Sequence, residues 1–216
     1  MFLKTNFAGD PNIGLYGFAT DKYCLLGTWG KEAKKVKDAL NVKVINAFLM
    51  EMPFLSLFSV GNSSGIIVPD IIEKHEIKEL KKHLKVHTLK TKYTCLGNLI
   101  VMNDNGIILA PVFRRKKAEI EKAFSLPTAV TTIGGSNVIG NLAITTNKGC
   151  LVTPKIKDNE KKIIEETLQV PVDIGTVSFG SFYVKSGIIA NSHGFVVSNR
   201  SSGIEMGKIN EALGFL

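Results

Sequence analysis

Short runs of apolar residues alternate with polar turns along the chain in a pattern that repeats. Residues 96–111 align with residues 139–154: each segment has a short apolar run, a polar turn ending in glycine, a second apolar run and then proline. Such a pattern predicts a β-hairpin with two buried strands. Weaker copies lie at residues 58–69 and 187–197, and the most divergent copy lies at residues 14–26.

The five predicted turns recur at a nearly constant interval. They end at Tyr23, Gly65, Gly106, Gly149 and Gly194, so that successive turns are 42, 41, 43 and 45 residues apart. A period of this length is typical of repeat architectures. Glycine at four of the five positions is expected where a tight turn needs a positive φ, and Tyr23 predicts a different turn in the first hairpin.

A helix is predicted after each hairpin. Apolar residues recur there at helical spacing, with lysine and glutamate on the other side. These apolar sets are Val36 and Leu40; Ile77, Leu80 and Leu84; Ile120 and Phe124; Ile164 and Leu168; and Ile209 and Leu213. Runs rich in β-branched residues follow the first four helices, at residues 42–45, 86–89, 128–132 and 170–174, and predict a third strand. Each repeat is therefore predicted to be hairpin, helix, strand.

The fifth helix has no strand after it, but residues 2–7 form an apolar segment ahead of the first hairpin. We expect this segment to supply the missing strand and to close the five repeats into a ring. A closed ring leaves no repeat with an unpaired end, so it needs no capping repeats.

Composition adds three constraints. A chain of 216 residues with 44% hydrophobic and 21% charged residues is that of a folded protein rather than a disordered one. Its three cysteines include no C-x-x-C pair, so neither a disulfide framework nor a zinc ribbon is predicted. The segment 44–60 is the most apolar, but Glu51 and Pro53 interrupt it, so we expect no membrane span. The N-terminus carries Lys4 and Asp10 and lacks a continuous apolar run, so we expect no secretory signal and a cytoplasmic protein.

Five such repeats in a ring resemble the pentein fold, an α/β propeller. Within that fold, the chain resembles the translation initiation factor 6 family over essentially its whole length. The resemblance is carried by residues 12–14, 60–62, 96–98, 103–104, 147–155, 170–177, Gly180 and 210–214. The chain ends near residue 216, without the longer eukaryotic tail, which is typical of archaeal members.

The resemblance implies a function. Members of this family bind the large ribosomal subunit and block its premature association with the small subunit. The implied partner surface is a ribosomal protein beside the sarcin–ricin loop, together with rRNA. By resemblance we expect a monomer with roles in translation initiation and large-subunit maturation, with no enzyme activity, cofactor or metal. We expect one pentein domain over residues 1–216, with repeats at 12–52, 53–94, 95–137, 138–181, and 182–216 joined by 1–11.

Repeat symmetry predicts where the binding face lies, because equivalent positions of a closed ring share one end of its axis. The candidate ribosome-binding residues are Gly14, Leu57, Asn62, Gly97, Asn98, Gly140, Asn141 and Gly187. Glycine there lets a partner's backbone approach, or relieves crowding at the mouth of the ring. The family's Leu-Gly-Asn motif falls on Asn98 directly and on Asn141 by repeat symmetry. Where relatives have Gly-Arg, this chain has Ser56 and Leu57.

The net charge of +8 leaves two interpretations open. Lysine and arginine cluster on the predicted helices, which form the outer rim of a pentein, so they are either a solvated rim or a field that steers the protein toward rRNA. A general RNA-binding module is therefore an alternative function.

A second alternative is a Cys-dependent, guanidine-modifying pentein enzyme, with Cys150 and His193 as candidate residues. We interpret Cys150 instead as a small buried apolar residue, because no His–Glu pair in matching context accompanies it. His83 and His87 are four residues apart, but we expect them on different elements, which disfavours a metal site. Residues 134–138 and 27–32 fail the G-x-S-x-G and P-loop patterns.

Overall fold

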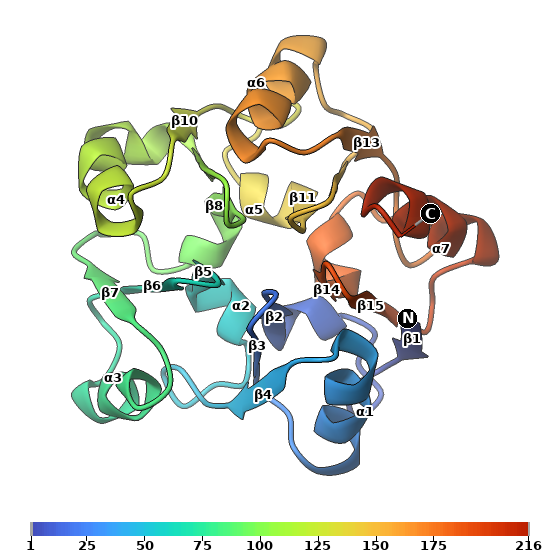
Figure 1. Ribbon diagram of the computed structural model, residues 1–216, viewed down its shortest axis with the longest axis horizontal. Helices are drawn as coiled ribbons and strands as arrows, with labels where there is room; N and C mark the ends of the chain where they lie inside the picture. The colour runs from blue at the N-terminus through green and yellow to red at the C-terminus, as the bar shows by residue number, and fades with distance from the viewer. Residues whose placement is uncertain (1, 216) are drawn as a thin grey trace.

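The computed structural model describes residues 2–215 as five similar units arranged in a ring (Figure 1). Each unit has a short helix, an antiparallel hairpin, a longer helix and a third strand parallel to the second strand of the hairpin. The sheets are accordingly five in number and three-stranded. This is the pentein architecture that the repeat pattern predicts.

The elements of the first three units follow one order. The first unit contains η1 (Ile13–Leu15), β2 (Gly17–Ala19), β3 (Tyr23–Leu26), α1 (Gly30–Leu40) and β4 (Lys43–Asn46). The second contains α2 (Leu55–Phe58), β5 (Val60–Asn62), β6 (Gly65–Pro69), α3 (Lys74–Lys81) and β7 (Val86–Leu89). The third contains η2 (Leu96–Asn98), β8 (Ile100–Met102), β9 (Ile107–Leu109), η3 (Pro111–Lys116), α4 (Lys117–Phe124) and β10 (Thr128–Val130).

The last two units complete the ring. The fourth contains α5 (Ile139–Leu142), β11 (Ala143–Thr145), β12 (Cys150–Val152), α6 (Asp158–Leu168) and β13 (Val172–Ile174). The fifth contains η4 (Val184–Gly187), β14 (Ile188–Asn191), β15 (Gly194–Ser198) and α7 (Gly203–Ala212). Its third strand is β1 (Phe2–Thr5), which pairs in parallel with β15, so the predicted closure by the N-terminal strand is confirmed.

The core is divided among the units. Five clusters of buried apolar residues lie between the sheets and the helices, and several join neighbouring units: one cluster includes Leu26 of the first unit and Val196 of the fifth. The longer helices cover the outer edge of the ring (Figure 1). None of the helices in the described residues 2–215 has the length and apolar character needed to cross a membrane.

Buried carboxylates at the starts of three helices hold the segments that cross between units. Each accepts hydrogen bonds from two consecutive backbone N–H groups of the crossing turn, at 2.7–3.2 Å. The acceptors are Glu76 for Met50 and Glu51, Glu160 for Gly134 and Gly135, and Glu205 for Phe179 and Gly180. Burial by itself raises the pKa of Glu160, but the hydrogen bonds it accepts outweigh burial and lower that pKa.

The glycines that end the hairpin turns have a different role from the predicted one. Gly106 and Gly149 do not adopt positive φ. A Cβ on Gly106 would lie 2.0 Å from the carbonyl oxygen of Thr167, and a Cβ on Gly149 would lie 2.1 Å from that of Ala212. Glycine is needed here because the end of the next unit's helix packs directly on the turn. The expectation of a positive-φ turn is wrong at these two positions.

Candidate functional site

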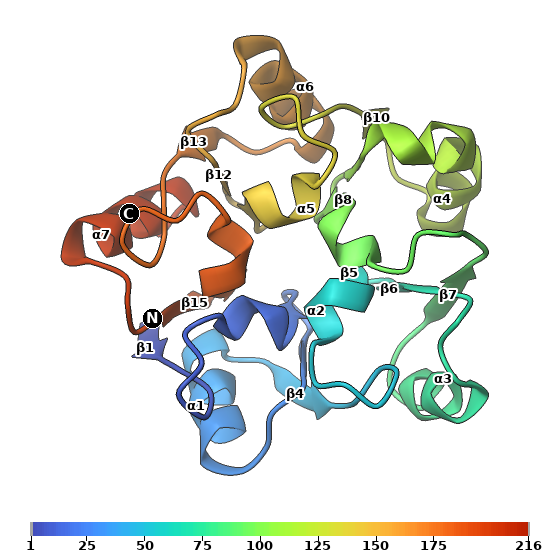
Figure 2. The same ribbon diagram turned by 180° about the vertical axis from the view of Figure 1, so that it is seen from behind.

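Five short helices, one from each unit, surround one end of the ring axis (Figure 2). They are η1, α2, η2, α5 and η4. The sequence pattern assigns these residues to the start of a strand, but each forms a helical turn before the strand begins. We call this end the short-helix face.

Equivalent positions of the five short helices have equivalent environments. The first residue of each is buried and apolar: Ile13, Leu55, Leu96, Ile139 and Val184. The second residue is also buried: Gly14, Ser56, Gly97, Gly140 and Lys185. The third residue is half-buried at the surface: Leu15, Leu57, Asn98, Asn141 and Ser186. Only the third position therefore offers side chains to a partner.

The glycines at the second position let neighbouring short helices touch. A Cβ on Gly97 would lie 1.8 Å from the carbonyl oxygen of Ser56, and a Cβ on Gly140 would lie 2.1 Å from that of Gly97. A Cβ on Gly14 would likewise lie 1.8 Å from the carbonyl oxygen of Lys185. Crowding within the ring explains these glycines, so they shape the face without themselves being exposed.

Lys185, and not Gly187, is the fifth unit's equivalent of these glycines. Gly187 lies two residues further on, where a Cβ would meet the side chain of Val177 at 2.6 Å. The prediction that Gly187 occupies the equivalent ring position is wrong, because sequence alignment of the fifth repeat is shifted by two residues at this point.

The ammonium group of Lys185 joins three units at the ring axis. Its Nζ donates to the carbonyl oxygen of Gly97 at 2.9 Å and to that of Ser56 at 3.4 Å. The side chain is buried, and burial lowers the pKa of Lys185 to about 8. A lysine thus fills the space that a small residue leaves in the other units.

A pH titration of stability tests this burial. The unfolded chain retains a lysine pKa of about 10.4, so between about pH 8 and that value the unfolded state binds more protons than the folded state. Stability contributed by this group therefore rises with pH, by about 3 kcal/mol over the window. Lys185→Met lacks the rise. Urea unfolding of both proteins across this pH range measures it, and parallel stability curves would contradict the burial.

The third-position residues give the face its chemistry. Leu15 and Leu57 are apolar, and Asn98, Asn141 and Ser186 carry groups that both donate and accept hydrogen bonds. The Oδ1 atom of Asn98 is buried and accepts no hydrogen bond from residues 2–215.

Exposed aromatic residues lie in the segment that leads into the short helix of the fifth unit, and the sequence pattern did not single them out. Tyr183 immediately precedes η4 and is 55% exposed, and Phe179 is 81% exposed. Lys155 Nζ lies 4.7 Å from the centre of the Phe182 ring, within the range of a cation–π contact. Aromatic residues are ordinarily assigned to the core from sequence, which is why only the structure reveals this group.

Asn62 does not lie on the short-helix face. It ends β5, at the opposite end of the hairpin from α2, and is only 3% exposed. Its Nδ2 donates to the carbonyl oxygen of Asn103, and its Oδ1 accepts from the backbone and hydroxyl of Ser64. Asn62 therefore joins turns of neighbouring units, and its placement with the other seven candidates is wrong.

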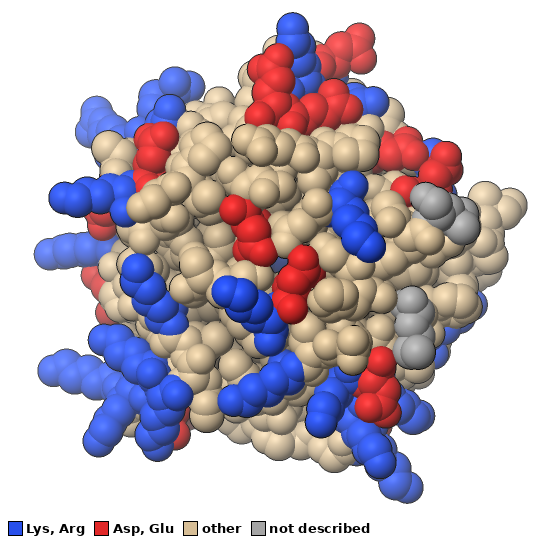
Figure 3. All heavy atoms as spheres, in the orientation of Figure 1, with Lys and Arg blue, Asp and Glu red and all other residues tan. Residues whose placement is uncertain are grey.

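A hydrogen-bonded ring of turn residues occupies that opposite end. The Nδ2 atom of Asn147 donates to carboxylate oxygens of both Asp21 and Asp104, each at 2.7 Å. Asp21 also accepts from the backbone of Ser192, and Asp104 from that of Ser63. Acidic side chains flank the central opening on this side (Figure 3). The turns of all five units thus interlock, because Tyr23 Oη in turn donates to Asn62.

Cavities near the ring axis are small. Two that are lined by described residues there have volumes of about 50 and 20 Å³, whereas small-molecule sites usually measure roughly 300–1,000 Å³.

Cys150, the candidate nucleophile, is also unsuited to catalysis. Cys150 is fully buried in β12, and burial raises the pKa of its thiol to about 12, so it is not a reactive thiolate near neutral pH. Among residues 2–215 no group of three His, Cys, Asp or Glu side chains is placed to hold a metal ion.

Comparison with known proteins decides the family. The model of the eIF-6 family matches residues 2–212. This chain belongs to the eIF-6 family. Translation initiation factor 6 of Pyrococcus horikoshii is 34% identical over 99% of this chain and 98% of that protein. The Methanocaldococcus jannaschii protein of the same name is 31% identical over 100% and 99% of the two chains. The family resemblance expected from the sequence is thereby confirmed, and it supports a role in translation initiation.

A solved structure gives a more distant likeness. DDAH from Pseudomonas aeruginosa, in a mutant form complexed with citrulline, matches with a TM-score of 0.48 and 13% sequence identity. The match covers 74% of this chain and 67% of that chain. At this distance the likeness does not bear on the function of this eIF-6 family member.

Proposed function

We propose that this eIF-6 family protein binds the large ribosomal subunit through its short-helix face and sterically prevents premature association with the small subunit. It acts in the cytoplasm as a monomer of one pentein domain, without catalysis or a cofactor, in translation initiation and in maturation of the large subunit. The observation that carries the location is the face itself: Leu57, Asn98 and Asn141 are the candidate residues that stand together at its surface.

The chemistry of this face supports a protein surface beside rRNA as the partner. Protein interfaces favour apolar, aromatic and amide groups, as found in Leu57, Asn98 and the neighbouring Tyr183. An exposed aromatic side chain with a lysine against it, as in Phe182 and Lys155, also suits stacking on an unpaired base.

The positive charge has a secondary role in this proposal. Basic side chains gather along the outer edge over α3 and α4 (Figure 3). Charges on the rim raise the rate of encounter with rRNA at low salt without specifying the contact. A general RNA-binding module would instead need its basic groups on the binding surface.

Sedimentation with purified archaeal ribosomal subunits tests the function. We expect the protein to comigrate with large subunits and not with small subunits, and to lower the yield of joined ribosomes when both are mixed. Binding to naked RNA with a steep salt dependence and no preference between subunits would favour the RNA-binding module. Turnover of arginine-like substrates that Cys150→Ala abolishes would favour an enzyme.

A further inference from the structure

A groove of about 460 Å³ lies between the first and second units, bounded by β4 and the segment after it on one side and by α3 on the other. The corresponding space between β7 of the second unit and α4 of the third unit measures only about 150 Å³. The groove belongs to the outer part of the ring and shares no residue with the short-helix face. It therefore needs an explanation of its own.

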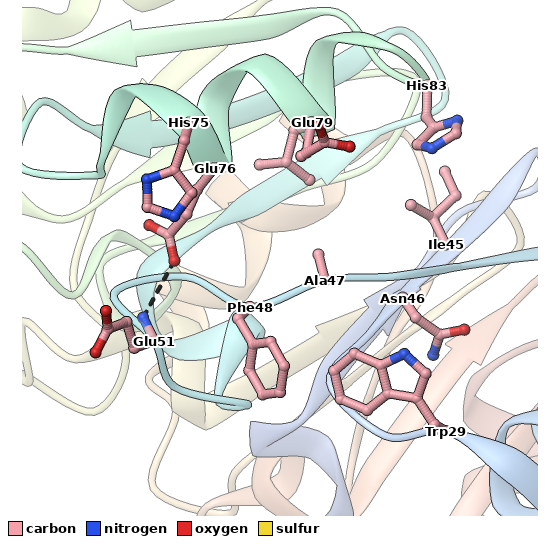
Figure 4. A pocket seen from close by; sticks show the side chains of 11 residues that line it. Trp29, Ile45, Asn46, Ala47, Phe48, Glu51, His75, Glu76, Glu79 and His83 are labelled. Carbon is pink, nitrogen blue, oxygen red and sulfur yellow. Dashed lines mark hydrogen bonds between the residues drawn. The ribbon is translucent and has the colours of Figure 1, made fainter.

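An aromatic pair forms one wall of the groove. The rings of Trp29 and Phe48 stand 4.6 Å apart at an angle of 32°, and the two side chains are 44% and 46% exposed. Figure 4 shows them side by side, facing α3 across Ala47. A tilted aromatic pair with this exposure offers exposed ring faces that a planar group can cover.

Helix α3 forms the opposite wall and carries acidic groups. His75, Glu79 and His83 follow one another at steps of four residues, so the helix and the turn after it turn these side chains toward the groove (Figure 4). Glu79 Oε1 accepts from Lys82 at 2.5 Å, and a carboxylate has a second oxygen for another donor.

The charge of the groove is opposite to that of the protein. Its described lining includes the carboxylates of Glu51, Glu76 and Glu79 but no lysine or arginine, although the chain has 27 basic and 19 acidic residues. Glu76 is occupied by the N–H groups of Met50 and Glu51, so the carboxylate of Glu51 and the second oxygen of Glu79, whose first oxygen is paired with Lys82, remain to meet a cation. The floor between the walls is apolar, with Ile45, Ala47 and Leu80.

We propose that this groove binds an arginine side chain of a partner protein. A guanidinium is planar and cationic, so it can stack on the aromatic pair and donate to the oxygen of Glu79 that Lys82 leaves free. Its methylene groups cover the apolar floor. A lysine side chain would neutralise the carboxylates but has no planar group to stack on the aromatic pair. A neutral side chain would leave the charges of Glu51 and Glu79 without a cation.

Trp29 provides a direct measurement because it is the chain's single tryptophan. The full-length protein is titrated, above neutral pH, with capped five-residue peptides that have arginine, lysine, citrulline or phenylalanine between glycines. We expect the arginine peptide to change Trp29 fluorescence saturably, the lysine peptide to bind at least about fivefold more weakly, and the citrulline peptide not to bind.

Variants place the binding in the groove. We expect Glu79→Gln to raise the dissociation constant for the arginine peptide by about fivefold, which corresponds to the loss of an exposed charge pair. Glu166→Gln is the matched control, since Glu166 is exposed on α6 and pairs with Lys162 across one helical turn; it should bind like the parent. Thermal unfolding of each variant verifies that it folds.

Four results would overturn the proposal. They are equal binding of the arginine and citrulline peptides, preference for the phenylalanine peptide, binding of free arginine as tightly as the peptide, and no response of Trp29 at millimolar peptide. The first two would indicate an apolar occupant, the third a small metabolite, and the fourth an empty groove. None of them affects the proposed ribosomal contact, because the short-helix face is separate.

Discussion

Substitution of Gly97 by alanine is expected to destabilise the protein by at least about 3 kcal/mol. The added Cβ would lie 1.8 Å from the carbonyl oxygen of Ser56 and 2.8 Å from that of Ser59. Both obstacles are backbone atoms of the neighbouring unit, so no side-chain rotation relieves the clash. The second and third units would have to move apart at the axis. Urea unfolding followed by circular dichroism measures the change.

Gly207→Ala is the control for the Gly97 substitution. Gly207 lies within α7, and a Cβ there meets no atom within 4 Å. Alanine is the better helix former, so this variant should gain about 0.5–1 kcal/mol. If Gly97→Ala unfolded at the same urea concentration as the parent, the tight contact between short helices would be contradicted.

Deletion of residues 2–7 is expected to abolish cooperative unfolding of the whole ring. The deletion removes β1, which pairs in parallel with β15 over four residues, and with it Phe7, which is 1% exposed. Phe7 belongs to the cluster that joins the first and fifth units. The loss therefore opens the ring at one interface and leaves β15 as an unpaired edge.

A peptide supplied in trans distinguishes ring closure from general damage. A synthetic peptide of residues 1–11 added to the truncated protein should restore a cooperative thermal transition in a concentration-dependent manner. A scrambled peptide of the same composition is the control. Unchanged melting of the truncated protein, without any peptide, would contradict the closed ring.

The architecture could be predicted from sequence because the same pattern occurs five times. A single hairpin such as residues 14–26 is ambiguous, but its spacing from the stronger copies fixes its place. The closing strand followed from counting elements, since the fifth repeat lacked a third strand and residues 2–7 lacked a partner. Both inferences depend on order along the chain, which a sequence records directly.

Contacts between units could not be predicted in the same way. Gly106 is needed because Thr167, 61 residues later, packs on it, and no local pattern records such a contact. The buried Lys185 resembles a surface lysine in sequence, because its environment is made by Ser56 and Gly97 from two other units. Glu160 and Glu205 likewise resemble ordinary helix-starting residues until their N–H partners are placed.

The grouping of most candidate residues at one end of the ring could be predicted from the repeat. Repeat symmetry brought Gly14, Leu57, Gly97, Asn98, Gly140 and Asn141 to one end of the axis. Gly187 was misplaced because the fifth repeat is shifted by two residues at this point, and Asn62, at the end of β5, lies at the opposite end of the hairpin from α2. Phe179, Phe182 and Tyr183 lie before η4, outside the hairpin, helix and strand pattern, so that pattern could not identify them.

Subunit joining with variants of the short-helix face tests the central claim most directly. A protein carrying Leu57→Glu and Asn98→Glu is compared with one carrying Thr88→Glu and Asn159→Glu, two exposed positions outside that face. We expect the first variant to need a concentration roughly tenfold higher or more than the parent to inhibit joining of purified archaeal subunits, because burying an unpaired charge at an interface weakens binding by at least about this factor. We expect the second variant to inhibit joining like the parent. Equal inhibition by both variants would contradict binding through this face.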